Sequence, residues 1–208
     1  MTRPDIQFAV NQLAQMVHNP SMNAMLGLKH LVRYLSRTRH AILLFPRKSS
    51  LVLSASSDSS WGSKHSPHGM TGNVFMIGNT PVAWWSKKQK MVATSTCEAE
   101  YEALKQLAVS AQWIRPLFNE IFRSKEVSIP TQLDNQAAIL TAEGEKISAR
   151  NRHFIMRQAL VREAIATKLL KVVYTPSDEV IADGLTKALQ RTKQEAFSKM
   201  LSMELFKH

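Results

Sequence analysis

Cysteine and acidic residues are scarce in this sequence. The single cysteine, Cys97, excludes a disulfide within the chain, and a lone thiol is typical of proteins from reducing compartments. The 208 residues carry 27 Lys and Arg against 16 Asp and Glu, which gives a formal net charge of +11. Such a surplus occurs in ordinary basic proteins, but it favours a polyanionic partner, because Lys and Arg commonly neutralise phosphates.

Extended apolar stretches are also missing. No stretch approaches the roughly 20 residues that a membrane-spanning helix needs. The opening residues, MTRPDIQFAV, contain neither the apolar core nor the cleavage site of a secretory signal. We therefore expect an intracellular protein without a membrane partner. A hydrophobic content of 44% is nevertheless enough for the core of one domain with an appendage.

The spacing of apolar residues predicts a mixed α/β fold. Helices are expected over residues 4–17, 21–37, 95–122, 135–143, 151–167, 177–189 and 190–208. Strands are expected over residues 51–58, 72–78, 81–86, 128–134 and 168–176, with residues 40–46 as a lead-in strand. Three antiparallel strands, a long helix and then alternating strands and helices indicate a mixed five-stranded sheet with helices on its faces.

We divide the chain into three parts on the basis of these elements. Residues 1–46 are expected to form a mostly helical appendage, residues 47–190 the domain built on the sheet, and residues 191–208 a C-terminal helical tail. Trp84 and Trp85 are consecutive on one predicted strand, so their side chains should face opposite sides of the sheet.

The segment TSTCEAEYEAL at residues 94–104 places a glutamate at every second position. When the apolar stripe of the long helix is followed back toward its start, the next position on that stripe is Glu100. Glu98 and Glu102 lie about 160° around the helix from it. We therefore expect Glu100 to face the sheet, and Glu98 and Glu102 to be solvated acids favoured by the helix dipole. The alternative is that the helix begins later, or that all three glutamates are solvated acids of its first turn.

A carboxylate on an inward-facing stripe requires protonation, a basic partner or a metal ion. Three aspartates could join Glu100, because Asp58 and Asp134 end predicted strands and Asp183 lies in the segment IADGL. Alone, each has a simpler role, as a turn residue, a helix N-cap or a solvated helix acid. Together the four would form a site of hard oxygen ligands suited to Mg²⁺ or Mn²⁺.

Several segments resemble a known family in both order and spacing. SDSSWG, TGNVFMIGNTPVAWWSKKQ, STCEAEYEAL, LDNQAAI, RNRHF and IADGLTKAL resemble the ribonuclease H domain of Pol polyproteins from copia-type LTR retrotransposons. TRPDIQFAVNQLAQMVHNPS and LKHLVRYLSRT resemble the end of the reverse transcriptase region and its connection, just upstream of that domain. The resemblance therefore covers nearly the whole chain, and it identifies residues 1–46 with the reverse transcriptase end and connection.

The resemblance implies a ribonuclease H-like fold and endonucleolytic, two-metal hydrolysis of the RNA strand of RNA–DNA hybrids, with two Mg²⁺ ions or with Mn²⁺ in their place. The catalytic and metal-binding residues it implies are Asp58, Glu100, Asp134 and Asp183. Ser60 stands where the family usually has a second acid, and Asp178 stands near the place of a mobile histidine in many relatives.

The partners implied by the resemblance are an RNA–DNA hybrid and the rest of Pol, including reverse transcriptase where it is present. The implied location is the cytoplasm, including a virus-like particle, or the nucleus. The sequence does not specify an oligomeric state.

Contacts to such a hybrid are expected from basic and amide side chains near the acids. Lysines and arginines would bind phosphates, and amides would reach a minor groove, where 2′-hydroxyls distinguish RNA from DNA. The residues expected to bind nucleic acid are Lys87, Lys88, Lys90, Asn135, Gln136, Arg150, Arg152, His153 and Lys187. Charge clusters of this kind also occur as solvated faces, and Lys187 can equally be a helix C-terminal charge.

Two rival functions use the same fold. One is a non-catalytic nucleic-acid-binding remnant of a truncated retroelement, which fits the lack of a polymerase Tyr-x-Asp-Asp motif. The other is an integrase-like strand-transfer domain, which the order of the motifs opposes. The nuclease reading is favoured because all four acids are present.

Overall fold

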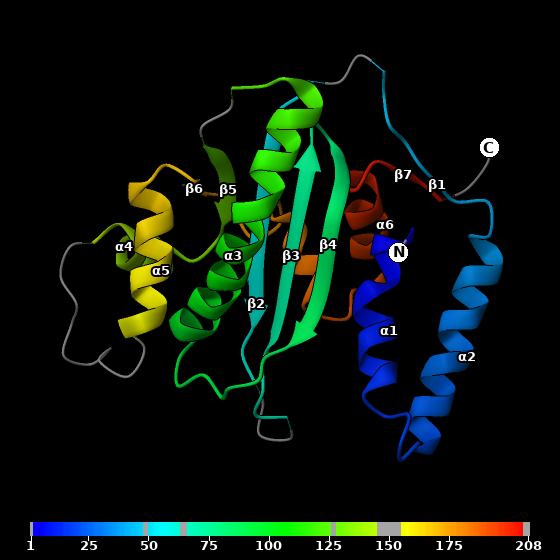
Figure 1. The fold of residues 1–208 in the computed structure, drawn as a ribbon. Helices are drawn as coiled ribbons and strands as arrows, with labels where there is room; N and C mark the ends of the chain where they lie inside the picture. The colour runs from blue at the N-terminus through cyan, green and yellow to red at the C-terminus, as the bar shows by residue number, and fades with distance from the viewer. Residues whose placement is uncertain (1, 48–49, 63–65, 126–127, 145–154, 206–208) are drawn as a thin grey trace.

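The computed structural model describes residues 2–47, 50–62, 66–125, 128–144 and 155–205. Its centre is a five-stranded sheet with the strand order β4-β3-β2-β5-β6 (Figure 1). The strands are β2 (Leu53–Ser60), β3 (Met70–Ile77), β4 (Thr80–Lys88), β5 (Ile129–Leu133) and β6 (Leu170–Tyr174). β2, β3 and β4 are antiparallel, whereas β5 pairs in parallel with both β2 and β6. The predicted mixed five-stranded sheet is confirmed.

The hairpin between β3 and β4 depends on a glycine. Ile77 pairs with Thr80, so Gly78 and Asn79 form a two-residue connection. Gly78 has a φ of 58°, a left-handed conformation that glycine adopts without steric cost. This tight connection joins the two strands, whose register shifts at an irregularity between Phe75 and Met76.

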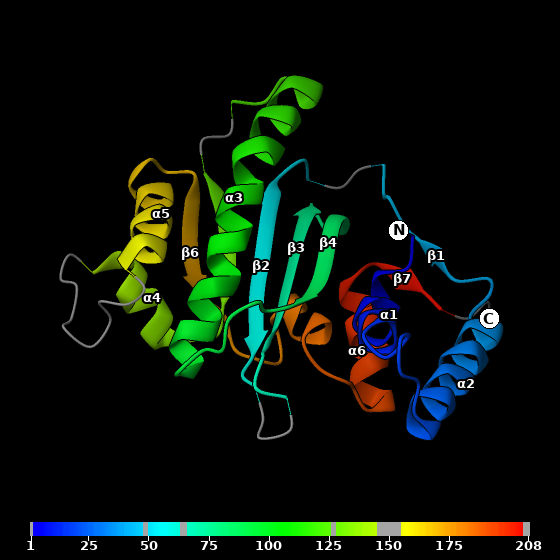
Figure 2. The ribbon, with the colours of Figure 1, turned by 60° about the horizontal axis from the view of Figure 1, so that its bottom comes forward.

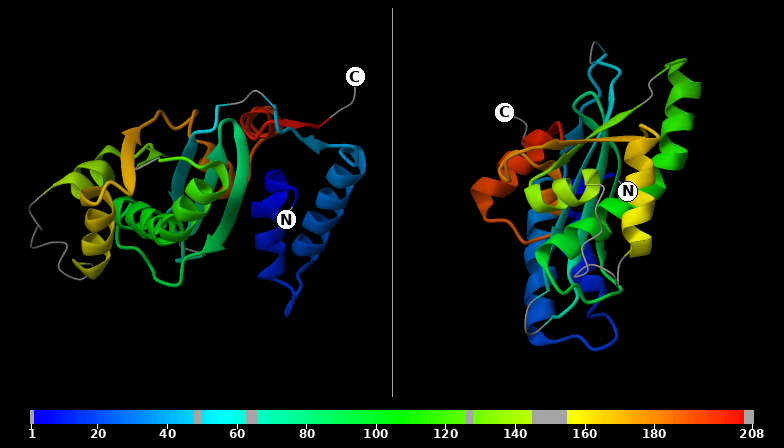
Figure 3. Two further views of the ribbon diagram at one scale, coloured as in Figure 1. Left: turned by 45° about the horizontal axis from the view of Figure 1, so that its top comes forward. Right: turned by 90° about the vertical axis from the view of Figure 1, so that its left-hand side faces the viewer.

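Helices cover both faces of the sheet (Figures 2 and 3). One face carries α3 (Thr96–Phe122), α4 (Gln136–Glu143) and α5 (Ile155–Ala166). The other face carries the short 3₁₀ helix η3 (Ile181–Leu185) and α6 (Arg191–Met200). Among the helices in the described ranges, none combines the length and the apolarity needed to cross a bilayer.

Each face of the sheet buries its own apolar cluster. The larger cluster joins α3 and α5 to β2, β3, β5 and β6, and it includes Leu53, Phe75, Leu104 and Leu107. The smaller cluster, built around Val74, Met76, Phe197 and Leu201, lies under η3 and α6. Side chains alternate between faces along a strand, so Trp85 packs on the first cluster and Trp84 on the second, as predicted.

The N-terminal segment contains the 3₁₀ helix η1 (Pro4–Ile6), α1 (Gln7–Ala14), α2 (Met22–Arg37) and the short strand β1 (Ile42–Leu43). α1 lies along β4, where the side-chain amide of Asn11 donates a 3.0 Å hydrogen bond to the carbonyl of Ser86. The Ser21 hydroxyl caps α2 by accepting from the amide of Ala24 at 3.1 Å. The N-terminal segment therefore contacts the sheet through α1, while the status of residues 1–46 as a separate domain stays a prediction.

The lead-in strand expected at residues 40–46 does not join the main sheet. β1 pairs instead with the C-terminal strand β7 (Met203–Glu204) in a separate two-stranded antiparallel sheet. The physical reason is that α1 lies along β4, the strand at that edge of the main sheet. The amide of Leu44 also donates a 3.0 Å hydrogen bond to the carbonyl of Ser202, which extends the contact between these two segments.

Two predicted helices differ from the structure. Residues 177–189 form only the five-residue η3, because this segment lies against β2 and β3. A Cβ atom on Gly72 would come within 2.7 Å of the carbonyl oxygen of Ala182, so the two backbones are in close contact. The helix expected over residues 190–208 ends at Met200, and the chain then turns at Ser202, whose φ is 51°, into β7.

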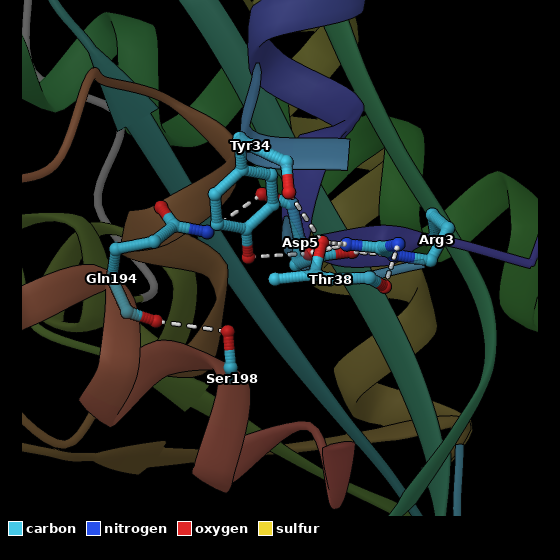
Figure 4. A network of polar contacts seen from close by, with 6 residues as sticks. All are labelled: Arg3, Asp5, Tyr34, Thr38, Gln194 and Ser198. Carbon is cyan, nitrogen blue, oxygen red and sulfur yellow. Dashed lines mark hydrogen bonds and ion pairs between the residues drawn. The ribbon is translucent and has the colours of Figure 1, made fainter. Parts of the chain in front are cut away.

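A buried network of polar side chains joins the N-terminal segment to α6 (Figure 4). The Asp5 carboxylate accepts hydrogen bonds from the guanidinium of Arg3 at 2.8 and 2.9 Å and from the hydroxyl of Tyr34 at 2.7 Å. The Arg3 guanidinium also donates to the Thr38 hydroxyl at 2.8 Å. On the other side, the side-chain amide of Gln194 in α6 donates to the Asp5 carbonyl at 2.9 Å.

The charges in this network are compensated. The Asp5 side chain is fully buried, and its salt bridge with Arg3 spans 2.8 Å. Burial and the Asp5 carboxylate raise the pKa of Tyr34 to about 12, so the phenol remains a donor throughout the neutral range. Asp5 therefore links η1, α2 and, through its backbone, α6.

We predict that Asp5→Ala destabilises the protein by about 3 kcal/mol, because it leaves the Arg3 guanidinium partly buried without its carboxylate. Urea unfolding gives the free energy directly. Glu195→Ala is the matched control, since its pair with Arg191 lies on the surface and is worth less than about 1 kcal/mol. Equal losses for the two variants would contradict a structural role for the buried network.

Candidate metal centre

Parallel strand pairing brings two of the predicted acids together. Asp58 lies near the C-terminal end of β2, and Asp134 directly follows β5. β2 and β5 are parallel neighbours, with Ala55 opposite Thr131, so the C-terminal ends of both strands lie side by side at the same end of the sheet. The first turns of α3 lie over β2 and supply Glu100. Carboxylate oxygens of these three residues lie within 4.8 Å of one another.

Glu100 faces the sheet, as its position on the apolar stripe predicts. Asp58 and Glu100 are only 5% and 6% exposed. Oε1 of Glu100 accepts a 3.3 Å hydrogen bond from the amide of Ser59, but its buried Oε2 accepts none from the residues that the structure describes. A buried carboxylate oxygen without a donor is costly, and a cation is one way to satisfy it.

The electrostatics of the site favour a cation. Burial, together with the charges of Asp134 and Asp183, raises the pKa of Asp58 from its ordinary 3.8 to about 6, although the hydrogen bond from Thr186 and the charge of Lys187 work in the opposite direction. Burial and the charge of Asp58 raise the pKa of Glu100 well above its usual range. Three carboxylates can each offer an oxygen ligand, and their negative charge is not fully compensated by nearby positive groups. Both properties fit a divalent ion such as Mg²⁺ or Mn²⁺.

Asp183 lies beside the three-carboxylate cluster but is not part of it. It belongs to η3, and its carboxylate forms an ion pair with Lys187. Burial lowers the pKa of the Lys187 ammonium, but the hydrogen bond with Asp183 and the charges of Asp58 and Asp134 outweigh this, and the net shift is upward. The structure thus brings three of the four acids together, and the roles of all four in catalysis and metal binding stay predictions.

Glu98 is not the solvated acid that its place on the helix suggested. It is 3% exposed, and its Oε2 accepts 2.8 Å hydrogen bonds from both the amide and the hydroxyl of Thr94. The backbone amide of Glu98 in turn donates a 3.1 Å hydrogen bond to the hydroxyl of Ser95, the N-cap residue of α3. These contacts fix the start of α3, two residues before Glu100. Glu102 is half-buried and lies 3.6 Å from Lys105, so it is not fully solvated either.

The residues expected to bind nucleic acid occupy three different places. Lys87, Lys88 and Lys90 are exposed where β4 ends. Asn135 caps α4, because its Oδ1 accepts from the amide of Ala138 at 2.9 Å, and Gln136 is exposed in the first turn of that helix. Lys187 is engaged by Asp183. Arg150, Arg152 and His153 lie outside the described residues.

Sequence reasoning missed several polar side chains that support the acids. Thr186 donates a 2.5 Å hydrogen bond to Oδ2 of Asp58, and Ser177 donates a 2.6 Å hydrogen bond to Oδ2 of Asp134. Gln89 is 2% exposed, and its amide donates to the carbonyl of Ala99, beside Glu100, at 3.0 Å. Hydroxyl and amide side chains are common in any sequence, so composition alone gave no signal for these roles.

Comparison with known proteins places the chain among transposon proteins. No protein-family model matches it. It is 32% identical over 203 residues to the retrovirus-related Pol polyprotein from transposon RE1 of Arabidopsis thaliana, a match covering 97% of this chain and 14% of that protein. It is 30% identical over 203 residues to the corresponding polyprotein from transposon TNT 1-94 of Nicotiana tabacum, over 97% and 15% of the two chains. The chain therefore spans only a small part of these relatives.

The fold also has a counterpart among solved structures. The N-terminal RNase H domain of a Mycobacterium tuberculosis protein, solved as a fusion with maltose-binding protein, is similar with a TM-score of 0.51 and 12% identity. The match covers 72% of this chain and 98% of that one. At this level of identity the similarity shows the fold, and the chain has a ribonuclease H-like fold.

We predict that the metal-free protein becomes less stable as the pH rises. The pKa of Asp58 is raised to about 6 in the folded state from about 3.8 when unfolded, so the folded protein holds this proton more tightly than the unfolded chain does. As the pH rises between these two values, the proton is lost and the folded state is destabilised relative to the unfolded state. Asp58→Asn should therefore raise the free energy of unfolding at pH 8 by about 1–3 kcal/mol, and much less at pH 4.

Urea unfolding in EDTA at the two pH values measures this difference. Glu120→Gln, an exposed substitution at the far end of α3, is the control and should leave the pH dependence unchanged. A loss of stability at pH 8 on replacing Asp58 would contradict the prediction.

Proposed function

Because the chain belongs to the retrovirus-related Pol polyproteins of copia-type transposons, we propose that it hydrolyses the RNA strand of RNA–DNA hybrids. The proposed active site consists of Asp58, Glu100, Asp134 and Asp183 with divalent metal ions. The observation that supports it most directly is the convergence of three carboxylates within 4.8 Å, one of which has a buried oxygen without a hydrogen-bond donor among the described residues.

The four acids would hold the ions through carboxylate oxygens, the ligands that Mg²⁺ and Mn²⁺ prefer. When bound, two such ions supply activation of water and stabilisation of the leaving oxygen in phosphodiester cleavage. The residues of the chain itself would hold the ions and position the phosphate. No side chain is needed as a nucleophile, since water is the attacking group in this reaction class.

The substrate side of the proposal follows from charge. A formal net charge of +11 and the exposed lysines at the end of β4, Lys87, Lys88 and Lys90, suit the binding of a nucleic-acid backbone. Asn135 and Gln136 stand directly beside Asp134, where amides can reach the 2′-hydroxyls of a hybrid minor groove. Binding should therefore weaken steeply with salt and depend little on sequence.

We predict that the protein cleaves the labelled RNA strand of a hybrid in the presence of Mg²⁺ and leaves the DNA strand intact. Asp134→Asn should reduce the cleavage rate by more than the roughly 100-fold that loss of a supporting residue costs, since it removes a metal ligand. The cleavage products are followed on a denaturing gel, with EDTA as the metal-free reference.

Glu120→Gln controls for the loss of a carboxylate far from the site and should cleave at the native rate. Single-stranded RNA and duplex RNA test the specificity for hybrids, and both should remain uncut. Salt-sensitive binding with the RNA left intact would instead identify a non-catalytic nucleic-acid-binding protein.

A further inference from the structure

The Thr186 hydroxyl is buried beside the acids rather than exposed around them. Thr186 is 2% exposed and directly follows η3. Its Oγ1 donates to Oδ2 of Asp58 at 2.5 Å, across 128 residues of sequence. Gly72 on β3 lies so close to Thr186 that an added Cβ atom would be only 2.8 Å from the Cγ2 methyl of the threonine. The backbone of β3 therefore packs against this methyl group and fixes the orientation of the side chain. The hydroxyl is therefore held toward Asp58 by packing.

A second hydroxyl from the same segment serves the second strand-end acid. Ser177 donates to Oδ2 of Asp134 at 2.6 Å. Between the two hydroxyls, the backbone amide of Ala182 donates to the buried hydroxyl of Ser56 on β2 at 3.2 Å, which anchors the segment to the sheet. One short stretch of chain thus places a donor on each carboxylate of the two parallel strands. This arrangement also explains why the stretch is not a continuous helix.

Converging carboxylates need such support when no cation is present. Like charges confined within 4.8 Å repel one another, and side chains free to rotate would separate. A hydrogen bond to an ionised carboxylate is stronger than one between neutral groups, so each hydroxyl opposes that separation. Each hydroxyl donates to Oδ2 of its aspartate, so the other carboxylate oxygen, Oδ1, takes no part in that hydrogen bond.

We propose that Thr186 and Ser177 are positioning residues that keep the carboxylates of Asp58 and Asp134 converged for a divalent cation. The inference rests on the metal-dependent function proposed above and adds to it the groups that prearrange the ligands. The alternative is that the two hydroxyls only stabilise the fold, in which case their loss lowers stability but leaves cation affinity unchanged.

Calorimetric titration of Mn²⁺ into the full chain, without nucleic acid, tests the proposal. Thr186→Val keeps the shape of the side chain but removes the donor, and it should raise the dissociation constant roughly 10- to 100-fold. Thr186→Ser restores the hydroxyl and should bind close to the native affinity. Ser177→Ala should weaken binding to a smaller extent, because Ser177 is exposed.

Thr80→Val is the matched control. Thr80 is 1% exposed, and its hydroxyl donates to the carbonyl of Leu44 at 2.8 Å, far from the acids along β4. Thr80→Val therefore loses a hydrogen bond from a buried threonine hydroxyl, as Thr186→Val does, but it should bind Mn²⁺ with native affinity. Kinetics on a hybrid give a second readout, since the metal concentration for half-maximal rate should rise in Thr186→Val while the Michaelis constant for the hybrid stays unchanged.

The outcomes separate the two proposals. Native protein that binds no divalent cation overturns both the proposed function and this inference. Native protein that binds, with Thr186→Val equal to Thr80→Val, overturns only the positioning role. Should Thr186→Val fail to fold, Ser177→Ala decides, because the exposed position tolerates the change and an unaltered dissociation constant would overturn the inference.

Discussion

Neighbouring strands bring several carboxylates together, and these carboxylates repel one another. This repulsion is the constraint on which the site and the contacts around it depend. β2 and β5 run parallel side by side, so Asp58 and Asp134 meet at one edge, and α3 places Glu100 over the same point. Burial of Asp58 and Glu100 removes the water that would screen their charges. The chain as a whole carries a formal charge of +11, so this cluster of acids belongs to a protein that is basic overall. Such a site attracts small cations, while the net charge of the chain favours polyanions.

Regular periodicity is what allowed most of the fold to be predicted. The short apolar runs of β3 and β4 and the helical spacing in α3 are local properties, so the sheet, its mixed topology and the opposite faces of Trp84 and Trp85 could be predicted from them. Glu100 was found in the same way, because a carboxylate on an apolar helical stripe must be neutralised, paired or bound to a metal ion. The convergence of Asp58 and Asp134 required one further rule, that parallel strands share their carboxyl ends.

One local contact and several contacts between distant segments account for what the sequence could not predict. Glu98 is buried because Thr94 and Ser95 form a capping arrangement with it, which outweighs its place on the outer face of the helix. The segment after Pro176 has the composition of a helix, but its backbone lies on Gly72 and Ser56, and those contacts determine its shape. β1 likewise depends on a partner far along the chain, β7, which no local pattern reveals.

The pairing of β1 with β7 has a consequence for how the protein is made. Ile42 pairs with Glu204, and the Asp5 carbonyl accepts from Gln194, so these contacts close very long loops of chain. Loop closure of this length is entropically costly and slows folding. During translation, α1 and α2 emerge long before the residues that complete their packing. The nascent chain therefore acquires this architecture only after β7 has left the ribosome.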